Sequence, residues 1–176
     1  MAVDPEWLKS HIRDIPGFPS PGIIFKDITP LLADVEAFRA TVDALADEYA
    51  GQQVDRVIGI EARGFILGAP VAYRLGAAFI PVRKPGKLPH DVEGLEYELE
   101  YGTDSLEVHR DALGAGHKVV IIDDVLATGG TAAAAASLVE KLGGEVVGLG
   151  FLMELAFLGG RSRLEGRDLR ALLVYD

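Results

Sequence analysis

The sequence predicts an α/β fold built on a mainly parallel sheet, and three observations support this prediction. Short apolar runs alternate with amphipathic stretches of helical length between residues 35 and 152. The run KVVII at Lys118–Ile122 is apolar throughout, as expected of a strand buried on both faces. Acidic and small residues follow it directly, where open parallel sheets bind ligands. Together these features favour a twisted sheet flanked by helices.

Composition narrows the class of protein further. The chain has 176 residues, which suits one domain, and it is 49% hydrophobic and 25% charged, as in folded proteins. A net charge of −10 argues against a nucleic-acid partner. The absence of cysteine excludes disulfides and thiolate chemistry. No apolar run reaches the roughly 18–20 residues of a membrane span, and the polar N-terminus is not a secretory signal, so we expect a cytoplasmic protein.

The N-terminal part of the chain is expected to lie outside the sheet. A short helix is predicted at residues 5–13. The segment Ile15–Pro30 holds four prolines and two glycines, so it is expected to be irregular but apolar. Asp34 is expected to cap a helix that closes at Gly51.

The remaining elements follow from apolar periodicity. We expect Pro70 to cut or kink the helix that contains it. Strands are expected at residues 57–60, 78–82, 118–122, 145–152 and 171–175, and helices at 64–75 and 131–142.

Residues 84–105 depart from this alternation. Turn residues are followed by Tyr97, Leu99 and Tyr101 at every second position, which predicts a two-stranded excursion from the sheet. The pattern fits a mobile lid and a plain surface hairpin equally well.

The segment VVIIDDVLATGGT, Val119–Thr131, carries the clearest chemical signal. A strand is expected to end in Asp123 and Asp124, and a short loop then opens a helix. Backbone N–H groups of such a loop, with the partial positive charge of a helix N-terminus, bind a monophosphate. Thr128 adds a hydroxyl donor, and the two carboxylates can accept hydrogen bonds from vicinal hydroxyls such as those of a ribose.

Alternative interpretations of this segment are weaker. The chain has neither the GxxxxGK(S/T) motif of P-loop proteins nor a GxGxxG motif after a strand. The four histidines show no metal-ligand spacing. An isolated pair of aspartates is most often a solvated strand end, but the complete 13-residue pattern favours a ligand site.

Val119–Thr131 resembles the signature of the type I phosphoribosyltransferases, which bind 5-phosphoribosyl-1-pyrophosphate. The segments Phe18–Leu32, Gly59–Ala72, Pro81–Pro89 and Tyr97–Leu113 resemble the members of that family that act on adenine. The resemblance extends over about Ile15–Arg161. It implies a type I phosphoribosyltransferase-like fold in one domain, residues 1–176, with an N-terminal hood at 1–33 and a mobile lid at 84–105. It also implies transfer of the phosphoribosyl group to adenine, giving AMP and pyrophosphate in purine salvage.

The resemblance implies a role for each of several residues. Adenine would contact Ile24, Phe25, Lys26, Leu155 and Leu158, although Phe25 could equally be a core residue, and Lys26 stands where the family often has arginine. Residues 61–64 match the pyrophosphate loop, which in the family often contains a cis peptide. Phosphoribosyl pyrophosphate would contact Asp123, Asp124, Ala127, Thr128, Gly129, Gly130, Thr131, Arg63, Arg83, Lys84, Lys87 and Tyr101.

The resemblance also implies a catalytic acid, a metal ion and an oligomeric state. Glu96, Glu98 and Glu100 share one face of the expected strand, and their spacing does not choose among them. The resemblance selects Glu100 as the catalytic acid. It further implies Mg²⁺ held mainly by the substrate, and a homodimer in which Arg83 reaches the neighbouring site.

Three alternative functions would each require sequence features that differ from those observed. An enzyme for another base would need a different pocket, and the resemblance of Phe18–Leu32 argues against it. A regulatory protein that binds the ligand without turnover usually carries a DNA-binding module, for which the chain has no room. A purely structural scaffold protein would leave two features unexplained: the adjacent carboxylates Asp123 and Asp124, here called the acid pair, and the cluster of basic residues.

Overall fold

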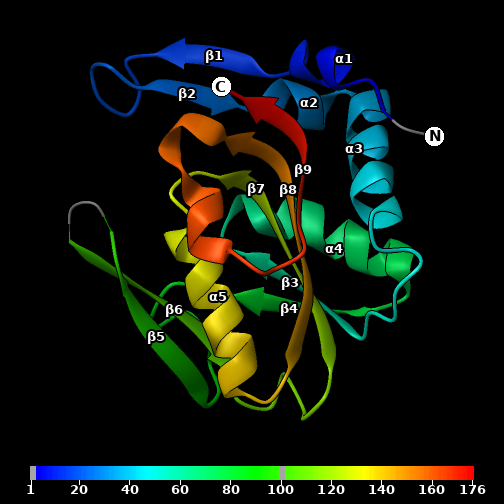
Figure 1. Ribbon diagram of the computed structural model, residues 1–176, viewed down its shortest axis with the longest axis vertical. Helices are drawn as coiled ribbons and strands as arrows, with labels where there is room; N and C mark the ends of the chain where they lie inside the picture. The colour runs from blue at the N-terminus through cyan, green and yellow to red at the C-terminus, as the bar shows by residue number, and fades with distance from the viewer. Residues whose placement is uncertain (1–2, 100–101) are drawn as a thin grey trace.

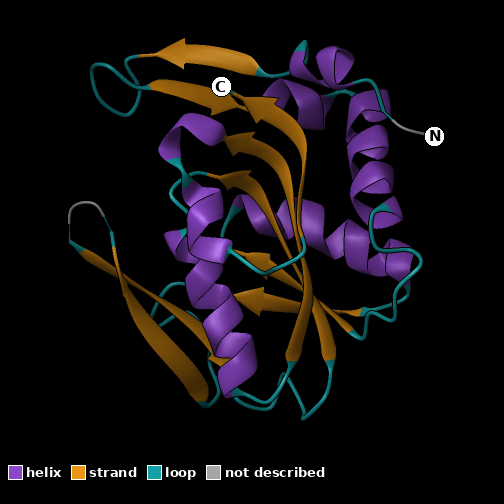
Figure 2. Cartoon of the chain, viewed as in Figure 1, coloured by secondary structure: helices purple, strands orange, loops and turns teal. Residues whose placement is uncertain are grey.

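A five-stranded parallel sheet forms the centre of the molecule in the computed structural model, which describes residues 3–99 and 102–176 (Figures 1 and 2). Each strand pairs in parallel with its neighbour, so the predicted fold class is confirmed. The strand order is β4-β3-β7-β8-β9, with β3 at Arg56–Ile60, β4 at Ala78–Val82, β7 at Lys118–Leu126, β8 at Glu145–Leu155 and β9 at Leu169–Tyr175.

Helices cover both faces of the sheet because successive strand residues point to opposite sides. Val57 and Val120 pack with α3 (Val35–Asp47) and α4 (Arg63–Leu75) in one apolar cluster. Their neighbours Ile58 and Ile121 pack with α5 (Gly130–Lys141) in the other cluster. Figure 1 shows α3 and α4 on one side of the sheet and α5 on the other.

The N-terminal segment is more regular than the sequence predicts. Helix α1 (Pro5–Lys9) precedes two short antiparallel strands, β1 (Arg13–Pro16) and β2 (Ile24–Asp27), and α2 (Thr29–Ala33) follows them. Gly17 and Gly22 have φ angles of 73° and 89°, which the turn between the strands requires. In Figure 1 this pair of strands lies over the carboxyl ends of β8 and β9.

Other boundaries also differ from the expectation. Strand β7 continues through the acid pair to Leu126, because Asp123 and Val125 still pair with β8. Helix α4 runs through Pro70 without a break, since Leu67 and Val71 on either side of it are buried against the sheet. Asp34 caps α3 as predicted, with its carboxylate accepting a hydrogen bond from the Ala37 N–H, but the helix ends at Asp47.

The excursion after β4 is an antiparallel hairpin of β5 (Val92–Glu98) and β6 (Thr103–His109). Arg83 and Glu107 exchange backbone hydrogen bonds, which joins the base of the hairpin to the chain leaving β4. Strand β5 also packs against α5. The predicted strands are therefore present, and the predicted mobility of this lid stays a prediction.

Candidate active site

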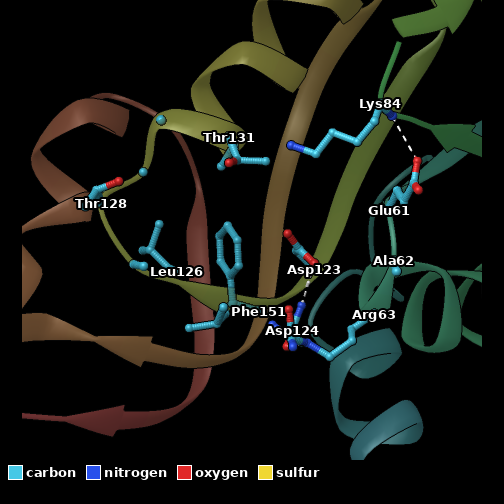
Figure 3. Close-up of a pocket in the computed structure, with 15 residues that line it drawn as sticks. Glu61, Ala62, Arg63, Lys84, Asp123, Asp124, Leu126, Thr128, Thr131 and Phe151 are labelled. Atoms are coloured by element: carbon cyan, nitrogen blue, oxygen red, sulfur yellow. Dashed lines mark hydrogen bonds and ion pairs between the residues drawn. The ribbon is translucent and has the colours of Figure 1, made fainter. Parts of the chain in front are cut away.

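A cavity of about 330 Å³ opens at the carboxyl edge of the sheet, beside the ends of β3 and β7 (Figure 3). Three chain segments meet there: the turn after β3, the residue Lys84 after β4, and the end of β7 with the start of α5. Nine of the predicted site residues line it, namely Arg63, Lys84, Asp123, Asp124, Ala127, Thr128, Gly129, Gly130 and Thr131.

The two carboxylates of the acid pair differ in their surroundings. The Asp124 side chain is 6% exposed and forms an ion pair with Arg63. Asp123 accepts a hydrogen bond from the Asp124 N–H at 2.9 Å and has no cationic partner among the ion pairs of the described residues. Burial, followed by the neighbouring charge of Asp124, raises the pKa of Asp123 well above its ordinary value. Asp123 is therefore held closer to its neutral form than an exposed aspartate would be.

The loop Ala127–Thr131 after β7, which we call the phosphate loop, has the geometry expected of an anion site. Gly129 has a φ of 81°, a left-handed conformation that a glycine adopts without strain. Gly130 is buried and begins the 12-residue helix α5. The first N–H groups of a helix have no partner within it, so they are available to a phosphate at this point.

Glu61 organises the basic residues on the opposite side of the cavity. Its carboxylate accepts hydrogen bonds from the Lys84 N–H at 2.9 Å and from the Lys87 ammonium, and Arg83 Nε lies 3.4 Å away. Burial alone would raise the pKa of Glu61, but these hydrogen bonds outweigh it and lower the pKa below its ordinary value. The peptide between Glu61 and Ala62 is cis. Arg83 and Lys87 thus gather at Glu61 without lining the cavity.

The hairpin is tied to the cavity through a second set of polar contacts. Asp104 on β6 forms an ion pair with Lys84. It also accepts a hydrogen bond from the Tyr97 hydroxyl at 3.2 Å, and that hydroxyl lies 3.2 Å from Thr131 Oγ1. The hairpin therefore contacts both Lys84 and Thr131, which lie on two sides of the cavity.

The residues predicted for adenine do not line this cavity. The Arg63 guanidinium is 5.2 Å from the centre of the Phe25 ring, which places Phe25 next to the acid pair. Lys26 instead pairs with Asp14 at 2.7 Å and covers the Tyr175 ring. Ile24 is exposed on β2, whereas Leu155 ends β8 and Leu158 ends the 3₁₀ turn Ala156–Leu158.

Two of the predicted site residues cannot be placed, and two residues at the site were not predicted. Glu100 and Tyr101 lie outside the described residues. Two further residues were not predicted from the sequence: Phe151 on β8, which lines the cavity, and Asp104 on the hairpin. Phe151 carries no sequence signal beyond that of a core residue. Asp104 could have been found from its register, since it faces Tyr97 across the hairpin.

The part of the chain that the structure describes contains no group of three or more histidine or acidic residues placed to hold a metal ion. Three carboxylates line the cavity, and basic side chains already engage two of them: Arg63 pairs with Asp124, and Lys87 pairs with Glu61. Such a site suits Mg²⁺ that takes most of its ligands from phosphate and water. Within residues 3–99 and 102–176 no helix is long and apolar enough to cross a membrane.

A parallel sheet with an acid pair and an anion-binding loop at its carboxyl edge is typical of a class of proteins that bind phosphorylated ligands. Consistent with this class, the family model for the phosphoribosyl transferase domain matches residues 29–167. Adenine phosphoribosyltransferase of Solibacter usitatus is 59% identical over 169 residues, covering 96% of this chain and 98% of the relative. That of Thermotoga neapolitana is 59% identical over 168 residues, covering 96% and 99%. The chain therefore belongs to the adenine phosphoribosyltransferase family.

Solved structures agree with this assignment. The crystal structure of adenine phosphoribosyltransferase from Thermoanaerobacter pseudethanolicus superposes with a TM-score of 0.95 at 55% identity, covering 98% of this chain and all of the other. The Saccharomyces cerevisiae enzyme, complexed with an imino-altritol bisphosphate and adenine, gives a TM-score of 0.90 at 42% identity, covering 96% and 97%. The fold is thus that of the family.

Proposed function

We propose that this protein transfers the 5-phosphoribosyl group of phosphoribosyl pyrophosphate to adenine, giving AMP and pyrophosphate in purine salvage. The observation that carries the proposal is the meeting of the acid pair, the phosphate loop and the turn Glu61–Arg63 around one cavity. These three segments supply partners for a diol, a monophosphate and a pyrophosphate, which are the three polar parts of that substrate.

Each part of the cavity has a distinct task in binding. Asp123 and Asp124 accept hydrogen bonds from the ribose hydroxyls, and the loop Ala127–Thr131 binds the 5′-phosphate through its N–H groups. Arg63 and Lys84 face the pyrophosphate. Both now pair with carboxylates, Asp124 and Asp104, so the pyrophosphate competes with those carboxylates for the two cations.

The reaction breaks the bond from C1 to the pyrophosphate oxygen and forms the bond from C1 to adenine N9, while the N9 proton is lost. Pyrophosphate leaves with the electron pair of the broken bond, and the cations of the cavity stabilise the negative charge that develops on it. Glu100 exchanges a proton with the adenine ring near N7 as charge shifts through the base. Tyr101 hydrogen-bonds to the substrate beside it.

Mg²⁺ is the proposed cofactor. Asp123 is the carboxylate available to it or to its bound water, and the metal would neutralise pyrophosphate charge and orient the leaving group. The lining residues support this role because they include few other carboxylate oxygens. Most of the metal's ligands would therefore belong to the substrate.

Adenine would bind between the cavity and the N-terminal hood, residues 1–33, where Phe25 stacks on its ring. Leu155 and Leu158 close that pocket, and the backbone at Ile24 reads the edge of the base. Lys26 would contribute indirectly, since its ion pair with Asp14 and its contact with Tyr175 join the hood to the end of β9. We also propose a cytoplasmic homodimer in which Arg83 reaches the neighbouring site and the hairpin, residues 84–105, closes as a mobile lid.

A substrate panel tests the proposal. Purified protein is incubated with Mg²⁺, phosphoribosyl pyrophosphate and, in parallel, adenine, hypoxanthine, guanine or orotate, and nucleotides are separated by chromatography. We expect AMP from adenine and no product from the other bases. Another nucleotide would overturn the base assignment, and no product despite measurable ligand binding would favour a regulatory protein.

A further inference from the structure

An ion pair outside the cavity closes a short loop between the two proposed substrate subsites. Arg161 donates to both carboxylate oxygens of Glu154, from Nε to Oε1 at 3.1 Å and from Nη2 to Oε2 at 2.5 Å. Glu154 is only 5% exposed, which is unusual for a carboxylate and requires such a partner. Arg161 also donates from Nη1 to the Leu169 carbonyl at 3.3 Å. The pair therefore joins β8, β9 and the segment between them.

The loop that this pair closes, residues 155–160, touches the phosphate loop at its far end. A Cβ atom at Gly160 would overlap the Ala127 carbonyl oxygen and would lie 2.9 Å from the Gly129 nitrogen. A Cβ atom at Gly129 would likewise overlap the Gly160 carbonyl. The two loops thus pack backbone against backbone, with glycine on both sides.

The phosphate loop depends on this backing because it has few anchors of its own. Its residues Ala127–Thr131 are small, so they make little side-chain packing. Gly160 is buried against Ala127 and Gly129, and Arg161 is the next residue along the chain. A displacement of the ion pair is passed directly to Gly160 and then to Ala127 and Gly129.

We propose that Arg161 and Glu154 are positioning residues that hold the phosphate loop in its binding geometry through Gly160. The same pair fixes the ends of the loop that carries Leu155 and Leu158, so it also sets the spacing between the adenine side and the phosphate side. The inference rests on the proposed function for the identity of the ligands. Neither residue contacts substrate.

Arg167 provides a matched control within the same segment. Its Nη1 donates to Glu140 at 2.7 Å, but Glu140 is 48% exposed on the C-terminal part of α5, far along the helix from Gly130. An exposed pair of this kind contributes little to stability or placement. Comparing Arg161→Met with Arg167→Met therefore distinguishes the loss of the buried Arg161–Glu154 ion pair from the general loss of an arginine.

The test measures the KM values for phosphoribosyl pyrophosphate and adenine, kcat, the melting temperature, and AMP affinity by calorimetry. We expect Arg161→Met to weaken the binding of phosphoribosyl pyrophosphate and of AMP about ten- to hundredfold, because small misplacements of binding groups have effects of this size. Arg161→Lys should recover part of the loss, and Arg167→Met should match the wild type. Gly160→Ala should weaken the binding of the same ligands without changing the charge of the protein. This variant tests the inference if Arg161→Met does not fold.

A double variant separates positioning from stability. Glu154→Gln combined with Arg161→Met leaves no unpaired buried charge. The double variant should therefore melt at a higher temperature than Arg161→Met but bind AMP as weakly as that single variant does. A lower melting temperature with unchanged KM and AMP affinity in every variant would overturn the inference and leave a purely structural ion pair. Failure of the proposed function would look different, because the wild type itself would then form no AMP.

Discussion

Arg63 and Asp124 form an ion pair across the floor of the cavity, although 61 residues separate them in the chain. The same guanidinium covers the face of the Phe25 ring at 5.2 Å. One cation therefore links the acid pair at the end of β7 to the hood that we propose binds adenine. It also leaves Asp123 as the carboxylate of the acid pair without a cation.

The unequal surroundings of the acid pair predict a pH-dependent effect of Asp123→Asn. A carboxyl whose pKa is raised by folding contributes stability that is fully present below its unfolded pKa and is lost as the pH rises through its folded value. As the pH rises above about 4, the wild type progressively loses that contribution, whereas asparagine stays neutral and its amide oxygen can still accept a hydrogen bond from the Asp124 N–H. We expect Asp123→Asn to melt higher than the wild type at pH 7 and nearly equal to it at about pH 4.

Melting temperatures of both proteins between pH 4 and pH 8 check this prediction. A variant that is equally stable, or less stable, at pH 7 would contradict the raised pKa. Phosphoribosyl pyrophosphate should nevertheless bind the variant more weakly, because a ribose hydroxyl loses a charged acceptor.

The proposed catalytic role of Glu100 predicts a change in turnover rather than in binding. Glu100→Gln keeps the size of the side chain but cannot exchange a proton, so kcat should fall by about 10²–10⁴-fold, the usual contribution of a positioned acid or base. KM values for both substrates should change little. Steady-state kinetics of Glu100→Gln beside Glu98→Gln, its nearest acidic neighbour in the hairpin, measure this. Equal effects of the two substitutions would remove Glu100 from the chemistry.

Gly64 is predicted to tolerate no side chain, because it packs against the acid pair. A Cβ atom there would lie 2.9 Å from Asp123 Oδ1 and 2.9 Å from the Ile122 carbonyl. We expect Gly64→Ala to cost about 1–3 kcal/mol of unfolding free energy, as overpacking does, and to raise the KM for phosphoribosyl pyrophosphate. Gly51→Ala is the control, since nothing lies within 4 Å of its Cβ position.

Urea unfolding and substrate kinetics of the two glycine variants test this contact. If Gly64→Ala were as stable and active as Gly51→Ala, the close approach of α4 to the end of β7 would be wrong.

Tyr49 presents a buried hydroxyl that has no hydrogen-bond partner in the described part of the chain. Burial raises its pKa, so the hydroxyl stays neutral and unpaired. Its ring is needed, because Gly148 and Gly150 leave room for it against β8. Tyr49→Phe should therefore be neutral or stabilise by up to about 1–3 kcal/mol, whereas Tyr49→Leu should destabilise. Thermal unfolding measures both, and a marked loss of stability in Tyr49→Phe would indicate a partner for the hydroxyl.

The strands of the sheet were predictable because their signals are local. Ile58 and Ile121 lie in short apolar runs between turns, and such runs are typical of strands buried on both faces. The pairing of β1 with β2 was not predicted, since Ile15 and Phe25 make contact only when the turn between them closes. The continuation of β7 past Asp123 was missed for a similar reason, because β8 supplies the pairing there.

The candidate phosphate site was recognisable from the sequence, because the acid pair, the glycines and the start of α5 all lie within the 13 residues Val119–Thr131. Which charges meet is set by the tertiary structure. Asp124 pairs with Arg63, Lys84 with Asp104, and Arg161 with Glu154 across turns or between separate elements. Ion-pair geometry depends on separations of a few ångströms, and those separations are set by how the segments pack rather than by their spacing along the chain.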